Sequence, residues 1–311
     1  MTTTRVTHRI DVTGPAEAVY RIVSDVTRWP LYFPPTIWAE RVSGDDREER
    51  IRIWALAQDE VRTWESRRRL RPDAYRVEFE QVRPADPVAE LGGAWSVEER
   101  GDGVCGVTLD HHYRAAGDDP VNLGRIARAV EANSVSELAN LKRVVEGRGR
   151  EPGLLLDFSD SQTIAGSAED AYDFVYDVAR WPERIPHVQA VDLKEGVTGL
   201  QYMKMDTRAL DGSVHTTVSG RVCTPSRRIV YKQTVLPPGL RAHRGEWLFE
   251  PAHDGTVTVT SRHVVILDPE ALAALPKPPA SLEAARAAVR HALGSNSRAT
   301  MAVAKEFVEA R

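Results

Sequence analysis

The sequence contains little of what secreted, membrane-bound or nucleic-acid-binding proteins require. Its 311 residues include only two cysteines, Cys105 and Cys223, which cannot build a disulfide framework and indicate a reducing compartment. No apolar run approaches the roughly 20 residues of a membrane span, and the N-terminal segment lacks the apolar core of a signal peptide. The net charge of -4 gives no basic surface for nucleic acid. We therefore predict a cytoplasmic protein with neither a membrane nor a nucleic acid as partner.

Several common catalytic motifs are also missing. There is no cluster of cysteines and histidines at zinc-binding spacing, so no metal site is predicted. No G-x-S-x-G sequence supplies a serine nucleophile on a tight turn. The small residues Gly93 and Ala94 are not followed by the helical pattern that a phosphate-binding loop needs. Any chemistry must therefore come from side chains that the fold brings together.

The sequence does contain an internal repeat. Residues 11–30 and 163–182 are identical at ten of twenty positions, at an offset of 152. The same offset relates residues 93–103 to residues 245–255, which share five residues. Several matches in one order and at one spacing indicate a duplicated domain, and the charged segment GRGREPG indicates the junction. The predicted parts are an N-terminal domain at 1–147, a linker at 148–153 and a C-terminal domain at 154–311.

Each copy has the pattern of an α+β domain. A strand-like segment opens the copy, and a short amphipathic helix follows. That helix ends at Trp29-Pro30 or Trp181-Pro182, because the residue before a proline avoids helical angles. Strand-like stretches separated by Gly, Asp and Pro turns come next, and a long helical stripe closes the copy. A sheet of this length must cover its apolar face. We therefore predict, twice in tandem, a curved antiparallel sheet that grips a long C-terminal helix around a cavity.

Polar residues at two places indicate such a cavity. Asn133 and Ser134 interrupt the apolar stripe of the first closing helix. In the segment WESRR, strand alternation puts Trp64, Ser66 and Arg68 on one face. An arginine that shares a face with a tryptophan is unusual in a purely apolar core. These three side chains are therefore expected either in a cavity or toward solvent.

These segments, in this order, resemble the helix-grip fold of the START/Bet v 1-like superfamily. The most informative pieces are DVTRWP and DVARWP, WESRR, the GAW and GEW strands, and NSVSELANLKRVVE in the first closing helix. The fused pair is similar to the didomain aromatase/cyclases of bacterial type II polyketide synthases. The resemblance covers nearly the whole chain, and the order and duplication of the pieces carry it.

The resemblance implies a substrate, a reaction and partners. Proteins of this class accept a poly-β-ketone that phosphopantetheine tethers to an acyl carrier protein, so that carrier protein is the implied partner, and a complex with the ketosynthase or ketoreductase is a further one. They direct aldol closure of the first ring and remove water to aromatise it. Fused members usually serve ketoreduced chains and close the ring between C7 and C12. The resemblance implies no metal or redox cofactor.

The resemblance also implies site residues. Arg68 stands at the position of a pocket arginine that follows a W-x-S motif, and Trp95 at that of a pocket tryptophan. Asp110 replaces a pocket glutamine on the last strand, and Tyr32 lies near the position of a pocket tyrosine. The remaining predicted substrate contacts are Trp64, Ser66 and Asn133 in the first copy, and Arg221, Trp247 and His263 in the second.

The predicted roles follow from charge. A fixed guanidinium can stabilise an enolate oxygen by roughly 10²–10³ in rate, so Arg68 is the predicted catalytic cation. Asp110 or His112 is the predicted proton carrier, because imidazole titrates near neutral pH. Strand alternation puts Asp110 and His112 on one face and His111 on the other. Filling of the core or the surface is an equal alternative for both histidines.

Two classes of function remain open at this point. One is the polyketide aromatase/cyclase, and the other is a non-catalytic carrier of a hydrophobic ligand such as a lipid or polyketide. Charged groups in the cavity favour the enzyme, whereas a wholly apolar cavity favours the carrier. Five of the seven tryptophans lie in the first copy, so we expect the richer pocket there. The enzyme also predicts a basic rim at the pocket mouth for an acidic carrier protein, formed by Arg67, Arg69 and Arg71.

Overall fold

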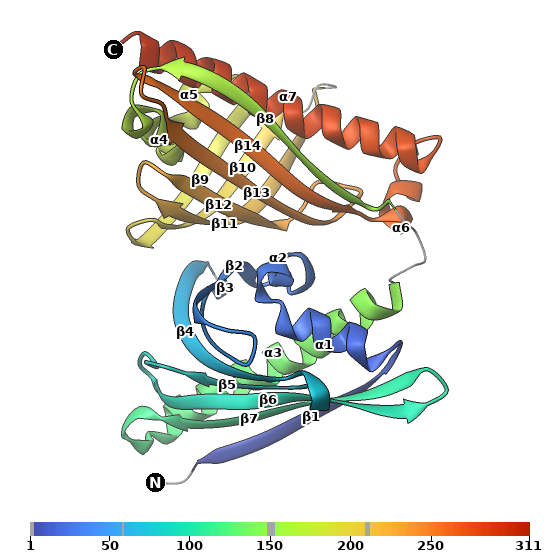
Figure 1. Ribbon diagram of the computed structural model, residues 1–311. Coiled ribbons are helices and arrows are strands. Elements are labelled where there is room, and N and C mark those ends of the chain that lie inside the picture. The colour runs from blue at the N-terminus through green and yellow to red at the C-terminus, as the bar shows by residue number, and fades with distance from the viewer. Residues whose placement is uncertain (1–2, 58, 148–152, 209–211) are drawn as a thin grey trace. The chain divides into compact units, whose positions relative to one another are not determined.

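Each copy of the repeat folds into a seven-stranded antiparallel sheet with one long helix at its C-terminal end (Figure 1). The computed structural model describes residues 3–57, 59–147, 153–208 and 212–311. The chain divides into two units. The linker predicted at 148–153 lies outside the described residues except for Gly153.

The N-terminal domain runs through a strand, two short helices, six strands and the long helix. Its elements are β1 (Thr4–Thr13), α1 (Ala16–Ser24), α2 (Trp29–Tyr32), β2 (Thr36–Gly44), β3 (Glu48–Ala57), β4 (Glu60–Arg71), β5 (Arg76–Gln81), β6 (Val88–Gly101), β7 (Val104–Ala115) and α3 (Pro120–Gly147).

The C-terminal domain repeats this order and adds one short helix before the long one. Its elements are β8 (Leu155–Ala165), α4 (Ala168–Tyr176), α5 (Trp181–Arg184), β9 (Val188–Val197), β10 (Leu200–Arg208), β11 (Val214–Thr224), β12 (Arg228–Val235), β13 (Leu240–Pro251), β14 (Thr256–Leu267), α6 (Pro269–Ala273) and α7 (Leu282–Glu309). Within the described residues, no helix is both long and apolar enough to cross a membrane.

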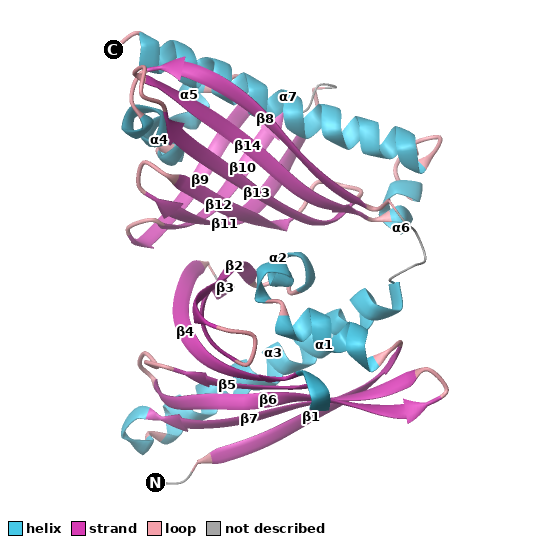
Figure 2. Cartoon of the chain, in the orientation of Figure 1, coloured by secondary structure: helices cyan, strands magenta, loops and turns pink. Residues whose placement is uncertain are grey.

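Both sheets are meanders in which the first strand pairs with the last. The strand orders are β1-β7-β6-β5-β4-β3-β2 and β8-β14-β13-β12-β11-β10-β9. Consecutive antiparallel strands need only short turns, so most of each sheet forms from local connections. The long helix of each domain lies against its sheet (Figure 2). The predicted fold class is therefore confirmed in both copies.

One strand of the N-terminal sheet is not evident from the sequence. β2 follows two prolines, and its last four residues are exposed, so it lacks a regular alternation of apolar and polar residues. Its first half nevertheless buries Ile37 and Ala39 completely. Burial of this short apolar half against the core sets the strand in place.

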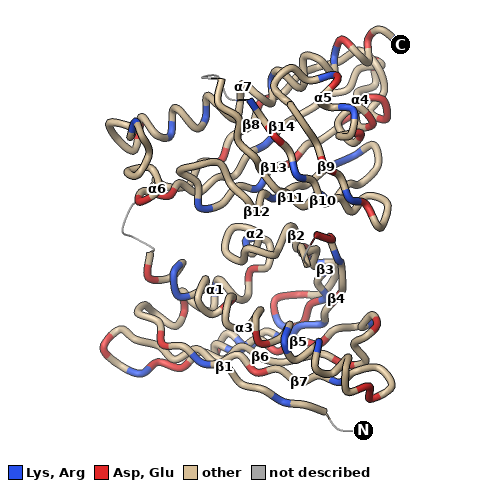
Figure 3. The backbone as a smooth tube through the Cα atoms, turned by 180° about the vertical axis from the view of Figure 1, so that it is seen from behind, with Lys and Arg blue, Asp and Glu red and all other residues tan. Residues whose placement is uncertain are grey.

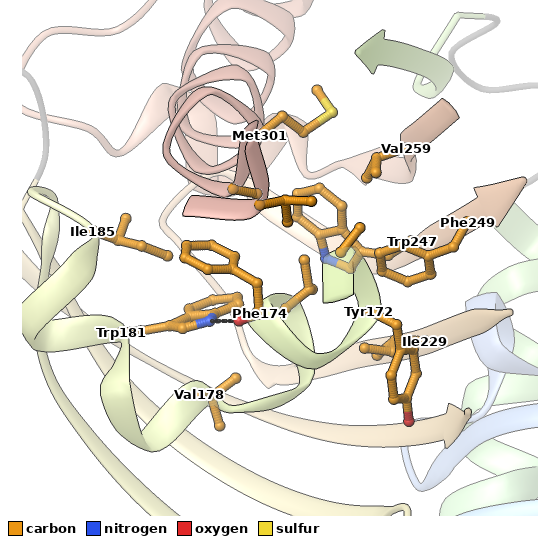
Figure 4. Close-up of a cluster of buried hydrophobic side chains, with 14 of the residues drawn as sticks. Tyr172, Phe174, Val178, Trp181, Ile185, Ile229, Trp247, Phe249, Val259 and Met301 are labelled. Atoms are coloured by element: carbon orange, nitrogen blue, oxygen red, sulfur yellow. Dashed lines mark hydrogen bonds between the residues drawn. The ribbon is translucent and has the colours of Figure 1, made fainter. Parts of the chain in front are cut away.

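A tryptophan holds the end of the first helix in each domain. Trp29 Nε1 donates a hydrogen bond to the Ile22 carbonyl at 3.0 Å, and Trp181 Nε1 donates to the Phe174 carbonyl at 3.3 Å (Figure 4). The last carbonyls of a helix have no partner within the helix itself. The indole therefore satisfies one of the helix carbonyls. The prediction that the helix ends at the Trp-Pro pair is wrong, because α1 ends at Ser24 and α4 at Tyr176, and the two Trp-Pro pairs take helical angles and open α2 and α5.

The cores lie between each sheet and the helices that cover it. In the C-terminal domain, Trp247 and Phe249 of β13 pack with Phe174 of α4 and Met301 of α7 (Figure 4). In the N-terminal domain, one stripe of α3 is buried. This stripe contains Ile126, Val130, Ser134, Leu138, Leu141 and Val145.

A glycine in each domain lets the long helix approach the turn after the first strand. Gly14 has φ +149°, and a Cβ there would lie 2.6 Å from Val145 Cγ1, while Gly166 has φ +142° and would meet Val308 in the same way. We expect Gly14→Ala to destabilise the N-terminal domain by about 1–3 kcal/mol, because the methyl group overpacks this contact. Urea unfolding would measure the effect. Gly124→Ala is the control, because its Cβ would meet only Arg128 Nη1 at 3.7 Å; equal stability of both variants would contradict the packing argument.

Candidate functional site

Arg68 lies inside the N-terminal domain and binds the end of α1. Alternation along β4 points Ser66, Arg68 and Leu70 inward, and only 1% of Arg68 is exposed. Its Nη2 donates to the Val23 carbonyl at 2.7 Å, and its Nη1 donates to the Ser24 carbonyl at 3.2 Å. These carbonyls form the negative end of the helix dipole, which favours a cation. The interpretation that Arg68 points toward solvent is therefore wrong.

A buried carboxylate and an indole complete the surroundings of Arg68. Glu49 Oε1 lies 3.0 Å from Arg68 Nη1, and both side chains are almost fully buried. The Arg68 guanidinium lies 5.3 Å from the centre of the Trp29 ring, close enough for a cation–π interaction. Burial lowers the pKa of Arg68 to about 10, so the group remains a cation at neutral pH. We call Arg68, Glu49 and Trp29 the arginine cluster.

The C-terminal domain contains the same arrangement with one change. Arg221 Nη2 donates to the Val175 carbonyl at 2.8 Å, and the guanidinium lies 5.7 Å from the centre of the Trp181 ring. Gln201 takes the place of Glu49, and its Oε1 accepts from Arg221 Nη1 at 2.6 Å. An arginine bound to the end of the first helix is thus a structural element of both domains. Only the N-terminal copy pairs it with a carboxylate at that position.

The other residues predicted on this side of the N-terminal sheet lie in or beside the core. Ser66 and Trp95 are buried. Trp64 is half-buried and packs, together with Trp29, against a small apolar cluster. Tyr32 is half-buried in α2 and packs against the main core. The structure thus brings Trp64, Ser66 and Arg68 onto one inner face, as the alternation predicts.

Asp110 and His112 lie on the opposite, outer face of β7. Asp110 Oδ1 accepts from Thr7 Oγ1 at 2.6 Å, and His112 Nε2 lies 3.6 Å from Glu90 Oε1. The neighbours that point inward along this strand are Leu109, His111 and Tyr113. The expectation that Asp110 or His112 moves protons in the interior therefore needs correction. Alternation assigns both to one face, but the buried neighbours decide that this face is the outer one.

The arginines predicted at the pocket mouth also lie on the outer face. Arg67, Arg69 and Arg71 alternate with inward-pointing residues of β4 and are exposed. Arg67 and Arg69 line an outer groove of about 460 Å³ whose floor includes the small residues Gly93 and Ala94. The groove is also lined by Arg5, Thr7, Arg76, Glu78, Glu80, Asp110 and His112. Acidic and basic residues are interspersed along the chain (Figure 3), and Glu78, Glu80 and Asp110 line the groove beside its arginines, so the groove is not uniformly basic.

The inner titratable groups of the N-terminal domain are ones that the sequence argument missed. His111 Nδ1 lies 3.4 Å from Ser134 Oγ, and burial lowers the pKa of His111 to about 4. Glu137 lies one helical turn after Ser134 and is half-buried on the same side of α3. Desolvation raises the pKa of Glu137 to about 7. An acidic residue next to an apolar stripe is the signal that could have identified it.

Asn133 is not part of this interior. Its side chain is exposed, whereas its neighbour Ser134 is fully buried and donates to the Val130 carbonyl at 2.7 Å. Successive helical residues point about 100° apart, so the choice between two neighbours depends on the helix phase. The predicted contact at Asn133 is corrected to Ser134.

A cavity of about 100 Å³ lies inside the C-terminal domain. The three residues predicted there, Arg221, Trp247 and His263, all line it. The richer pocket was expected in the N-terminal copy, whereas this cavity lies in the C-terminal one. The position of Trp64, which fills space in the N-terminal domain, corresponds to the smaller Thr217 in the C-terminal domain.

Hydrogen bonds between buried polar groups line one side of this cavity. His263 Nε2 lies 2.8 Å from Ser297 Oγ, and His263 Nδ1 lies 3.0 Å from His243 Nε2. His243 Nδ1 in turn lies 2.7 Å from Gln233 Oε1. Burial lowers the pKa of His263 to about 4 and that of His243 well below its usual value, so both rings are neutral at neutral pH. We call these four residues the histidine relay.

The fold and these interiors define a class of protein: two tandem helix-grip domains with polar groups buried between sheet and helix. A family model described as polyketide cyclase/dehydrase and lipid transport matches residues 3–146 and 156–304. The chain belongs to this family. It is accordingly an enzyme of the cyclase/dehydratase type, as the sequence resemblance implies.

Individual relatives match over nearly their whole length. The chain is 39% identical over 303 residues to a granaticin polyketide synthase bifunctional cyclase/dehydratase of Streptomyces violaceoruber, covering 97% of this chain and 93% of the relative. It is 39% identical to the actinorhodin counterpart of Streptomyces coelicolor, covering 96% and 94%. The crystal structure of the di-domain ARO/CYC BexL from the BE-7585A biosynthetic pathway is 47% identical, with a TM-score of 0.87 and 99% of each chain covered.

Proposed function

We propose that this enzyme closes the first ring of a ketoreduced poly-β-ketone between C7 and C12 and then removes water to aromatise it. The substrate is tethered to an acyl carrier protein. The observation that carries the proposal is the pair of titratable groups, His111 and Glu137, on the inner side of an N-terminal domain that belongs to a cyclase/dehydratase family. A carrier of apolar ligands has no need of either group.

Ring closure requires only a modest base in the enzyme, because a methylene between two ketones is already acidic. Neutral His111 is the group we assign to accept that proton, with Ser134 Oγ 3.4 Å from its Nδ1. The resulting enolate carbon attacks the ketone across the new ring, and protonated His111 gives its proton to the alkoxide that forms, which yields the hydroxyl and restores neutral His111. The positive charge of Arg68 favours the negative enolate oxygen, and the arginine cluster fixes that charge in place.

Dehydration requires a general acid that protonates the leaving hydroxyl. Glu137, whose pKa lies near 7, is the group we assign to donate a proton to the departing hydroxyl. The hydroxyl leaves as water, a carbon–carbon double bond forms, and His111 takes the proton lost from the neighbouring carbon. Return of that proton through solvent restores both groups, so no other reactant is consumed.

The outer groove is the surface that we assign to the carrier protein. Arg67 and Arg69 line it, and a guanidinium pairs well with the phosphate of phosphopantetheine. A ketosynthase or ketoreductase complex is a further proposed partner, and the cytoplasm is the proposed location. Positive and negative side chains nearly balance in the groove, so its electrostatic attraction for an acidic carrier protein is weak. This fits a transient rather than a tight complex.

The product of a reconstituted synthase tests the proposed function. Purified protein is added to a minimal synthase with its ketoreductase, and products from labelled acetate are analysed by mass spectrometry and NMR. We expect a dehydrated product whose first ring is aromatic and closed between C7 and C12. An unchanged mixture of shunt products would favour the non-catalytic carrier instead.

A further inference from the structure

Two buried hydroxyls in the C-terminal cavity are not satisfied by the protein. Thr207 is 3% exposed and Ser219 is 2% exposed. Among the described residues, Thr207 Oγ1 and Ser219 Oγ have no hydrogen-bonding partner. Both residues line the cavity, from β10 and β11. Such hydroxyls destabilise a fold unless another molecule binds them, so they indicate a polar ligand.

The histidine relay provides a second polar end, and its proton positions follow from its partners. Gln233 Oε1 only accepts, so the proton of neutral His243 is on Nδ1. His243 Nε2 is then an acceptor, which puts the proton of His263 on its Nδ1. His263 Nε2 therefore accepts from Ser297 Oγ, and Ser297 Oγ itself accepts from Ser261 Oγ at 3.0 Å. This leaves an ordered, uncharged chain that ends at the cavity.

The N-terminal domain holds only part of this relay: Gln81, His111 and Ser134 stand at the positions of Gln233, His263 and Ser297. By the sequence repeat, the N-terminal domain has Leu91 at the position of His243 and Leu109 at the position of Ser261. Leucine at both positions gives a sheet of the same topology. Buried polar networks are expensive unless they are fully satisfied, and the sheet forms without His243 and Ser261, so these two side chains of the C-terminal domain are not required by the fold.

The remaining walls and the volume of the cavity restrict the ligand. Flat or flexible apolar side chains form much of these walls, namely Trp181, Trp247, Met203, Met205 and Leu293, and the lining also includes the polar residues His187, Arg221, Tyr231, Asn296 and Thr300. An apolar cavity of about 150 Å³ holds one benzene molecule. A cavity of about 100 Å³ is smaller than this, so it excludes a whole polyketide chain, and it takes a single ring when the flexible side chains of Met203 and Met205 move aside.

We propose that the C-terminal cavity binds one hydroxylated six-membered ring of the resorcinol class. One ring hydroxyl donates a hydrogen bond to Ser297 Oγ at the end of the histidine relay. The other ring oxygen forms hydrogen bonds with Thr207 and Ser219. The ring itself lies between Trp181 and Trp247. The choice of ring rests on the proposed function: closure and loss of one water leave two ring oxygens in a 1,3 relation when the reduced carbon of the chain lies outside the ring.

Binding of a simple ring to the full chain tests this inference. Isothermal titration with orcinol is compared with titration of toluene, which has the ring and methyl group but no hydroxyls. We expect orcinol to bind at least tenfold more tightly, because toluene leaves the buried polar groups unpaired. Equal affinity for the two ligands, or no binding of orcinol, would overturn the proposal.

A double variant separates a binding role from a structural one. Thr207→Val with Ser219→Ala removes the two unsatisfied hydroxyls with little change in volume. We expect orcinol affinity to fall at least tenfold while the melting temperature stays the same or rises. Ser297→Ala should weaken binding to a similar degree. Thr258→Val is the matched control, because its hydroxyl lies outside the cavity lining, and it should leave affinity unchanged.

A double variant with unchanged affinity would show that the hydroxyls serve no ligand. The assay uses the isolated chain and a free ring, so it does not depend on the carrier protein or on turnover. If the reconstituted synthase shows no cyclase activity but the chain still binds orcinol, only the proposed function is contradicted. Retained cyclase activity without orcinol binding would count against this inference alone.

Discussion

Replacement of Arg68 by alanine should destabilise the N-terminal domain by about 3–5 kcal/mol. The substitution leaves Glu49 buried without the guanidinium 3.0 Å away, and it removes the donors bound to the Val23 and Ser24 carbonyls. It also removes the cation beside Trp29. Urea unfolding followed by tryptophan fluorescence measures the effect, because five of the seven tryptophans lie in this domain.

The second domain suggests the matched control for this experiment. Glu49→Gln converts the arginine cluster to the neutral pair that Arg221 and Gln201 already form at 2.6 Å. We expect Glu49→Gln to lose less stability than Arg68→Ala, because Arg68 keeps its bonds to the two helix carbonyls, and the main loss is the ion pair of Glu49 Oε2 with the half-exposed Arg41 at 2.7 Å. An Arg68→Ala variant with the unfolding midpoint of the wild type would contradict the structural role. Loss of product from such a stable variant would instead favour a direct role of Arg68 in the reaction.

Replacement of Glu137 by glutamine should slow dehydration by about 10²–10⁴, the usual contribution of a general acid. Ring closure should persist, because His111 and Arg68 remain. The wild-type dehydration rate should fall above about pH 7, where Glu137 loses its proton, and the variant should lack this decline. Rapid-quench kinetics over the range of roughly pH 5–9 measure both effects. An unchanged rate in the variant would remove Glu137 from the mechanism.

The stability of the same variant gives an independent check on Glu137. Its pKa is raised from 4.5 to about 7, so the folded state binds its proton more tightly than the unfolded state does. The wild type therefore loses stability as pH rises from about 4.5 through about 7. Glu137→Gln should lack this loss and gain stability relative to the wild type at higher pH. Glu306→Gln on the exposed side of α7 is the control and should follow the wild type.

The fold is largely predictable from the sequence because periodicity and duplication reinforce each other. The alternating strands and the two long helical stripes each have a local signal, whereas the Trp-Pro pairs begin the short helices α2 and α5 instead of ending the helix before them. β2 is missed because only Ile37 and Ala39 of its short inner half carry the apolar signal.

The candidate site is less predictable, because its geometry depends on contacts that the sequence does not record. Alternation groups Asp110 with His112 but does not say which face is inside. The partners of Arg68 are main-chain carbonyls 44 and 45 residues earlier, and no motif encodes them. A shift of one residue in helix phase is enough to confuse Asn133 with Ser134.

The most direct test of the central claim is the mass of the product released by the Glu137→Gln variant in the reconstituted synthase. The account predicts that the wild type yields the aromatic first ring, while the variant accumulates a cyclised compound heavier by one water. Fully dehydrated product from the variant at the wild-type rate would contradict the assignment of the acid to the N-terminal domain. Uncyclised shunt products from a folded variant would contradict the separation of closure from dehydration.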